Sequence, residues 1–273
     1  TVLVVGAGPA GLECARVAAE RGHQVTLCEA SPQLGGQFRL AGLTPRRGQI
    51  LELLDWYQTQ LNKLAVTVNF NKYMDAADVI NVGADEVILA TGSLADGLAR
   101  QRWLGHVEAM PGLDHKVYTV EEVLCKQATL GKQVIILDEG GNWRGLGTAM
   151  YLLDKGHQLT IVTPDAYVGK ELSRTTADLD LRAKLKQGGA IFMVESVISQ
   201  WHGDGATVTS MLDHTSTRVS SSALVVATTN MAFNELELAL AELNHHYHAI
   251  GDCVAPRQAP FAFHEGRKLG LSI

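Results

Sequence analysis

The stretch TVLVVGAGPAGLECARVAAERGHQVTLCEA, residues 1–30, determines the fold class. It opens with an apolar run, Val2–Val5, which enters a glycine-rich turn. A helical stretch then runs to Arg21, and Gly22 fits a helix C-cap. A second apolar run, Val25–Cys28, follows. This order of strand, turn, helix and strand predicts a βαβ unit that offers a phosphate site at the start of its helix.

The turn has the spacing G-x-G-x-x-G, at Gly6, Gly8 and Gly11. Gly6 permits the tight turn, Gly8 lets the backbone approach a pyrophosphate, and Gly11 lets the helix pack closely on the strand. Pro9 is tolerated because its missing N–H costs little in a first helical turn. Glu29 stands 23 residues after Gly6 and can accept hydrogen bonds from an adenosine ribose. The stretch predicts binding of a dinucleotide or ADP; a turn that serves packing alone would not explain the acid.

The chain repeats itself. Residues 22–27, GHQVTL, match residues 156–161, GHQLTI, at an offset of 134 positions. The repeat predicts a second strand–turn–helix–strand unit between about Gln133 and Thr163.

The second unit carries a degenerate phosphate motif. At the same offset, Gly8 is matched by Asn142, whose side chain stands where the backbone should approach a pyrophosphate, and Trp143 adds bulk beside it. Asp138 and Glu139 place negative charge at the mouth of the turn, which would repel phosphate. No acid matches the ribose-binding one. These departures put NAD(P)H binding in doubt and favour a retained fold with a lost or reshaped site.

The remaining chain alternates apolar runs with amphipathic stretches, which implies a parallel, doubly wound α/β sheet. Residues 93–131 are expected to connect the two units. Helices are expected at residues 48–64, 180–187 and 261–271, and strands at 66–70, 87–90, 190–194, 206–212, 223–227 and 247–250.

The composition excludes several classes of function. The 273 residues carry a net charge of −6 and no basic run, which argues against nucleic acid and anionic membrane surfaces. The apolar stretches are shorter than the ~20 residues of a membrane span. Four dispersed cysteines without a C-x-x-C pair argue against a zinc or iron–sulfur site and favour buried free thiols in a reducing, cytoplasmic compartment. A core strand at the first residue suggests a piece of a longer polypeptide.

Two further groups contain ionisable side chains. His245, His246 and His248 form a cluster, but its sequence neighbourhood lacks a spaced set of carboxylates or thiols, so a solvated loop before the last strand is expected. His264 and Glu265 are expected to be a surface pair on a helix. No catalytic set and no metal site is predicted.

Four motifs indicate a resemblance to a known family. The chain resembles the flavoproteins with two dinucleotide-binding domains, through GAGPAG ending in Glu29, Gly35-Gly36-Gln37, Ala90-Thr91-Gly92 and Ile250-Gly251-Asp252. More narrowly, it is similar over its whole length to the C-terminal region of the 2,4-dienoyl-CoA reductase, trimethylamine dehydrogenase and histamine dehydrogenase family. The stretches LGGQFRLA, GKQVIILDEGG and IGDCVAPRQAP carry that closer likeness.

The resemblance implies two Rossmann-like doubly wound domains, the second inserted into the first. Residues 1–110 and 231–273 would form the domain that binds FAD, or only ADP as in the amine dehydrogenase branch. Residues 111–230 would form the NAD(P)-binding-like domain with the degenerate motif.

The resemblance also assigns cofactor-binding residues. The glycine turn would hold the pyrophosphate, and Glu29 with its neighbour would hold the ribose. The other motifs would lie along the rest of the cofactor, and the last helix would direct its N-terminus at the flavin. The positions are Gly6, Gly8, Pro9, Ala10, Gly11, Glu29, Ala30, Gly36, Gln37, Ala90, Thr91, Gly92, Gly251, Asp252, Ala259 and Pro260.

In the family, an N-terminal Old Yellow Enzyme-like barrel carries FMN and a 4Fe–4S cluster and determines the substrate. The resemblance implies that barrel as a partner in the same polypeptide, a homo-oligomer at full length, and in the dehydrogenase branch an electron-transfer flavoprotein as acceptor.

Three functions are therefore open. The first is an FAD-binding electron-transfer module of a larger oxidoreductase acting on an amine or enoyl-type substrate, which alone would show no turnover. The second is a structural module that holds ADP without a redox role. The third is an NAD(P)H-dependent flavin reductase.

Overall fold

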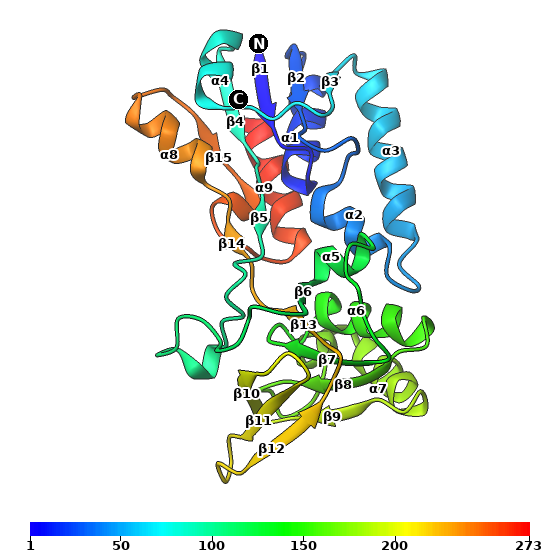
Figure 1. Ribbon diagram of the computed structural model, residues 1–273. Helices are drawn as coiled ribbons and strands as arrows, with labels where there is room; N and C mark the ends of the chain where they lie inside the picture. Colours follow the sequence, from blue (N-terminus) through cyan, green and yellow to red (C-terminus); the bar gives the residue numbers. More distant parts are fainter. The chain divides into compact units, whose positions relative to one another are not determined.

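The computed structural model describes residues 1–273, which form two compact units (Figure 1). Unit 1 comprises Thr1–Gly42, Arg47–Leu94 and Asn230–Ile273, and unit 2 comprises Leu43–Arg46 and Ala95–Thr229. Unit 2 is thus inserted into the chain of unit 1. Residues 95–110, which were expected in the first domain, belong to unit 2 because Ala99 and Met110 are buried in its core.

Unit 1 is built on five parallel strands. Their order is β15 (His248–Ala249), β4 (Glu86–Leu89), β1 (Val2–Val5), β2 (Val25–Cys28) and β3 (Thr67–Asn69). Parallel strands need crossover connections, and helices supply them. The helices are α1 (Pro9–Glu20), α2 (Gly36–Gly42), α3 (Gln49–Lys63), α4 (Ala76–Val82), α8 (Glu235–Glu242) and α9 (Ala259–Ser272). Two short strands, β5 (Ser93–Leu94) and β14 (Met231–Ala232), pair antiparallel where the chain leaves and re-enters unit 1.

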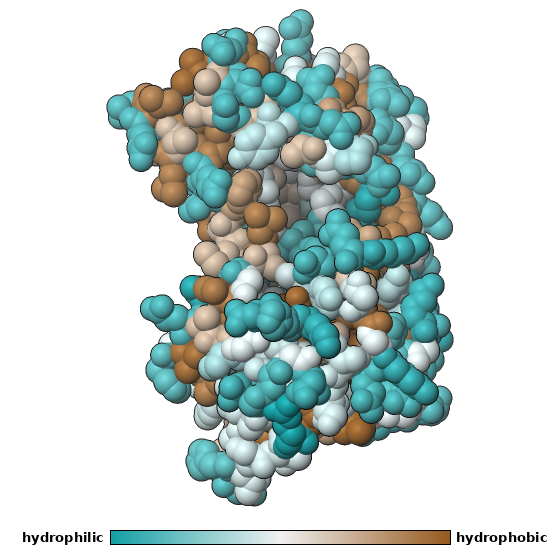
Figure 2. Space-filling view, viewed as in Figure 1, coloured by the Kyte–Doolittle hydropathy of each residue, from teal (hydrophilic) through white to brown (hydrophobic).

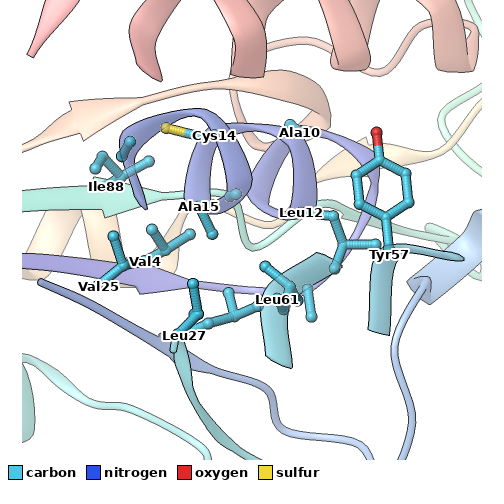
Figure 3. Close-up of a cluster of buried hydrophobic side chains, with 14 of the residues drawn as sticks. Val4, Ala10, Leu12, Cys14, Ala15, Val25, Leu27, Tyr57, Leu61 and Ile88 are labelled. Atoms are coloured by element: carbon cyan, nitrogen blue, oxygen red, sulfur yellow. The ribbon is translucent and has the colours of Figure 1, made fainter. Parts of the chain in front are cut away.

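Helices cover both faces of this sheet. On one face, Val4, Leu27 and Ile88 pack against α1, α3 and α9. Figure 3 shows Leu12 of α1 and Leu61 of α3 facing Leu27 within this cluster. On the other face, neighbouring strand residues pack against α4 and α8. The predicted doubly wound α/β fold is confirmed.

Helix α9 packs directly on α1 because it carries glycines at the contact. A Cβ atom added to Gly266 would lie 2.2 Å from the carbonyl oxygen of Ala10, and one added to Gly270 would lie 2.9 Å from the Cβ of Val17. The C-terminal helix is therefore fixed on the helix that follows the glycine turn.

Unit 2 repeats the architecture and adds a second sheet. Its parallel sheet has the order β6 (Val117–Thr119), β13 (Ala223–Ala227), β7 (Gln133–Asp138), β8 (Gln158–Val162) and β9 (Ile191–Met193). Its antiparallel sheet contains β10 (Ser196–Trp201), β11 (Gly205–Ser210) and β12 (Ser216–Ser220). The helices are α5 (Val120–Leu124), α6 (Trp143–Asp154) and α7 (Ala177–Gln187), with 3₁₀ turns at Arg102–Leu104 and Lys170–Thr175.

The internal repeat corresponds to the same local structure in both units. Gly22 has φ of 98° and Gly156 has φ of 86°, and each ends a helix before a strand. The N–H of His23 donates to the carbonyl of Ala18, as that of His157 does to Leu152. The glycines permit the left-handed residue that closes such a helix end.

The surface carries both polar and apolar residues. Figure 2 shows polar and apolar residues interspersed on the visible face, with apolar atoms over α8, where Leu238 and Leu243 are exposed. All four cysteines are free; Cys14, Cys28 and Cys253 are buried as expected, but Cys125 is exposed. None of the helices combines the length and hydropathy that a membrane crossing requires.

Candidate functional site

The glycine turn of unit 1 leaves the start of α1 accessible. Gly8 is the N-cap residue, in extended conformation, and no side chain caps the helix there. A Cβ atom added to Gly8 would meet nothing within 4 Å, so the space beside it is open. Pro9 occupies the first turn, and Ala10 follows it as a buried residue. Unpaired N–H groups and the helix dipole make this end suited to an anion.

The outer glycines of the motif serve packing. A Cβ atom at Gly6 would lie 2.2 Å from the carbonyl oxygen of Ala90, and one at Gly11 would lie 1.9 Å from the carbonyl oxygen of Gly6. This packing places Ala90, at the end of β4, directly against the turn. Thr91 is fixed by its Oγ1, which donates to the carbonyl of Phe233 at 2.6 Å. Two of the sequence motifs therefore meet here.

Glu29 connects the end of β2 to the glycine turn. Its Oε2 accepts from the N–H of Ala7 at 2.7 Å, and its Oε1 accepts from the N–H of Ser31 at 2.8 Å. Each carboxylate oxygen has a further lone pair, so Glu29 can also accept from ribose hydroxyls. Ala30, beside it, is exposed.

A polar network links the remaining motifs through Ser93, which the sequence motifs do not include. The Nε2 of Gln37 donates to the carbonyl of Ser93 at 2.9 Å, and the Oγ of Ser93 donates to Oδ2 of Asp252 at 3.1 Å. The Nδ2 of Asn230 donates to the Ser93 Oγ at 3.2 Å, while its buried Oδ1 has no hydrogen-bond partner. Gly36, next to Gln37, faces the glycine turn, since a Cβ atom added to it would lie 3.6 Å from the Cα of Gly8.

The start of α9 lies beside this network. Its N-cap, Gln258, makes no side-chain cap, and Ala259 and Pro260 form its first turn. Asp252 Oδ1 accepts from the N–H of Arg257 at 3.1 Å.

Glu265 has a structural role that the sequence pattern did not predict. It was expected to form a surface pair with His264, which is indeed exposed. The carboxylate of Glu265 instead accepts hydrogen bonds from the N–H of Gly251 at 2.8 Å and from the guanidinium of Arg257 at 2.5 Å. Because Gly251 has φ of 75° and a Cβ there would lie 2.8 Å from the Cβ of Ala10, this loop is held against α1.

The matching turn of unit 2 is filled by the protein's own side chains. Asn142 caps α6, its Oδ1 accepting from the N–H of Arg144 at 2.8 Å. The carboxylate of Asp138 is fully buried and accepts from the N–H of Gly141 at 3.0 Å. Burial raises the pKa of Asp138 to about 7. The N–H groups that bind phosphate in such turns are here bonded to side chains.

Charges next to this turn neutralise each other. Glu139 is buried and accepts from the backbone N–H and the Nε of Arg102, at 3.1 and 3.0 Å. Asp165 accepts from Arg102 at 3.2 Å and from Lys170 at 3.3 Å. The two cations are thus paired with carboxylates.

The family model described as pyridine nucleotide-disulphide oxidoreductase matches residues 1–266. N,N-dimethylglycine/sarcosine dehydrogenase of Chromohalobacter salexigens is 40% identical over 180 residues, covering 64% of this chain and 25% of that protein. Cinnamate reductase of Clostridium sporogenes is 40% identical over 161 residues, covering 59% of this chain and 22% of that protein.

The solved structure of histamine dehydrogenase from Rhizobium sp. 4-9 superposes with a TM-score of 0.93 at 26% identity, covering 98% of this chain and 43% of that one. The matched segments span about a quarter of the length of these curated relatives. Because the family match covers nearly the whole chain and the fold agrees, the chain belongs to the pyridine nucleotide-disulphide oxidoreductases, in the group of flavin-dependent oxidoreductases that includes histamine dehydrogenase.

Proposed function

We propose that this chain is the FAD-binding electron-transfer module of a larger oxidoreductase. One contrast carries the proposal: the helix start at Gly8 is uncapped and open, whereas the equivalent start at Asn142 is capped by the protein itself. The first turn would therefore accept a pyrophosphate, and the second would not. Family membership supports a flavin nucleotide in unit 1.

Unit 1 has polar groups for both halves of FAD. The glycine turn would bind the pyrophosphate, and Glu29 would accept from the adenosine ribose. Gln37 and Asp252, linked through Ser93, would hold the flavin half. The buried Oδ1 of Asn230, which lacks a partner, is an acceptor that a bound donor would satisfy. These features favour FAD over ADP, because ADP would leave Gln37, Asp252 and Asn230 without a ligand.

Bound FAD would accept electrons and pass them on. The uncapped start of α9 would stabilise the negative charge of a reduced ring by ~0.3–1 kcal/mol, and by more if partly buried.

The activity of the whole protein is proposed from the names of its relatives. Their names describe oxidation of methylated amines and histamine and reduction of cinnamate, so an amine or enoyl-type substrate is proposed. The short share of their length that this chain spans supports further domains in the same polypeptide. A barrel carrying FMN and a 4Fe–4S cluster, an electron-transfer flavoprotein as acceptor, a homo-oligomer and a cytoplasmic location complete the proposal.

A second candidate is an NAD(P)H-dependent flavin reductase. One observation favours it: unit 2 contains a shallow hollow of about 400 Å³ that is lined by Tyr167, Arg182, Lys186 and Phe192. Arg182 and Lys186 could meet an anionic nucleotide, but each already lies over an aromatic ring. The filled turn at Asp138 weighs against this candidate.

The test is made on the purified chain. Its visible spectrum is recorded, and the ligand released by heat is identified by chromatography. FAD is expected; ADP without colour would instead support the structural module, and rapid bleaching by NADPH would support the reductase.

Gly8→Val provides the matched variant. It is expected to fold, because the space beside Gly8 is open, and to lose the nucleotide. Gly48→Val, at another glycine with open space around it, is expected to retain the ligand. Retention of FAD by Gly8→Val would contradict the placement of the pyrophosphate.

A further inference from the structure

Three potential metal ligands meet at one edge of the sheet of unit 1. They are the carboxylate of Glu86 and the imidazoles of His246 and His248, whose ligand atoms all lie within 4.8 Å of one another. Glu86 and His248 are partly buried and His246 is exposed. The sequence pattern predicted these histidines in a solvated loop without a carboxylate nearby, and Glu86 corrects that expectation.

The sheet topology creates this cluster from distant parts of the sequence. His248, on β15, pairs in register with Ile88 of β4. Glu86 lies two residues before Ile88 and therefore on the same face of the sheet. Its Oε2 lies 3.0 Å from the Nε2 of His248, across a separation of 162 residues.

His246 makes the arrangement more than a hydrogen-bonded pair. Its ring meets that of His248 edge to face, with centroids 5.0 Å apart and planes at 83°. A simple Glu86–His248 pair would not need a second imidazole beside it. Two imidazoles and one carboxylate are the donor set that Zn²⁺ takes in sites with one position left open.

We propose that Glu86, His246 and His248 bind one divalent transition-metal ion, with Zn²⁺ as the best match. Zinc holds such ligands at about 2.0–2.2 Å, and ligand atoms that all lie within 4.8 Å of one another are close enough to share one ion. Ca²⁺ and Mg²⁺ prefer all-oxygen sets and fit poorly. Water would complete the coordination.

The location indicates a structural role. Glu86 opens β4, whereas the glycine turn lies at the other end of that strand, next to Ala90. The ion would fasten β15, an edge strand of two residues, to β4. The proposal is independent of whether unit 1 binds FAD.

The experiment titrates Zn²⁺ into the chain in competition with a chromophoric chelator. All proteins carry Cys125→Ser, because an exposed free thiol can itself bind zinc and would add a competing site. One tight site per chain is expected, together with a higher melting temperature in the presence of zinc. His246→Ala and Glu86→Gln should each weaken binding by roughly tenfold or more and abolish the thermal shift.

His245→Ala is the matched control. Its Nδ1 contacts the carbonyl of His246 at 2.9 Å, and it lies outside the cluster. It should bind zinc as the parent does. The proposal fails if the parent shows no tight site, or if His246→Ala and Glu86→Gln bind like His245→Ala, which would place the ion at other histidines. Since His246 is exposed and lies in a loop, its substitution should leave the fold intact.

Discussion

The carboxylate of Asp138 accepts a hydrogen bond from the backbone N–H of Gly141 at 3.0 Å, inside the turn where a phosphate would bind. Its other oxygen is buried without a partner. A Cβ atom at Gly145 would lie 2.3 Å from this carboxylate, so the side chain fills the space between strand and helix. The Asp138 side chain thus occupies the N–H group of Gly141, which a bound phosphate would use.

This burial makes stability depend on pH. Because the pKa of Asp138 is raised to about 7 in the folded protein, the folded state keeps a proton that the unfolded chain releases near pH 4. Unfolding free energy should therefore fall as the pH rises from about 4 to 7, at about 1.4 kcal/mol per pH unit from this group. Asp138→Asn should flatten that slope and be more stable than the parent by a few kcal/mol above pH 7.

Urea denaturation at pH 5 and pH 8 measures this effect. Asp114→Asn, at an exposed aspartate, should keep the parent's slope. Equal slopes for Asp138→Asn and the parent would contradict the prediction.

Gly11→Ala tests the packing of the first turn. Alanine favours helices over glycine by ~1 kcal/mol, but its Cβ would lie 1.9 Å from the carbonyl oxygen of Gly6. Backbone atoms cannot move far enough to relieve this contact. Urea denaturation should therefore show that the free energy of unfolding falls by ~3 kcal/mol or more. Gly48→Ala, at an N-cap with open space and φ of −55°, should instead change the free energy of unfolding by no more than about 0.5 kcal/mol. An unchanged free energy of unfolding in Gly11→Ala would contradict the close packing of Gly11 against Gly6.

The sequence predicted those parts of unit 1 that local patterns encode. Gly8 and Glu29 stand at fixed distances along one βαβ unit, so their spacing alone indicates their place. Ser93, Asn230 and Glu86 were missed because their partners lie far away in the sequence. Only the pairing of β5 with β14 and of β4 with β15 brings them together.

The cysteines provide a direct measure of burial. Burial raises the pKa of the Cys14 thiol to about 12, and that of Cys253 also rises. Only the thiolate reacts, so a disulfide reagent at pH 8 should modify Cys125 rapidly and the buried thiols only on unfolding. One reactive thiol per native chain and none in Cys125→Ser is the expected count; fast reaction of a second would show that a core opens readily.

Ser93→Ala tests the network proposed to hold the flavin half. The hydroxyl donates to Asp252 and accepts from Asn230, so its removal leaves the partly buried amide of Asn230 without this acceptor. Asp252 would then lose the hydroxyl group that positions it, so retention of FAD should fall by about tenfold, which corresponds to a loss of about 1.4 kcal/mol of binding free energy. Ser272→Ala, at an exposed serine near the end of α9, should retain FAD as the parent does. Unchanged retention by Ser93→Ala would separate this network from the cofactor.

Glu13 and Arg16 form a buried ion pair that joins three helices. Arg16 donates to both oxygens of Glu13, at 2.9 and 2.7 Å, and Tyr57 and Arg267 also donate to them. Burial alone would raise the pKa of Glu13, but the hydrogen bonds from Arg16 and Tyr57 outweigh it and hold the pKa below its usual value. The stability that ionised Glu13 contributes is present at neutral pH, and it is lost as the pH falls through the pKa of Glu13 in the folded protein.

Arg16→Met should therefore destabilise the chain by ~3–5 kcal/mol at pH 7, because it leaves a buried carboxylate short of its main partner. Arg16→Met combined with Glu13→Gln should cost less than the two single losses added together, since the uncompensated charge is then absent. The loss in Arg16→Met should also shrink in acid, where Glu13 can take up a proton. Urea denaturation of all four proteins at pH 7 and pH 5 measures both effects, and strictly additive, pH-independent losses would show that Arg16 acts through packing alone.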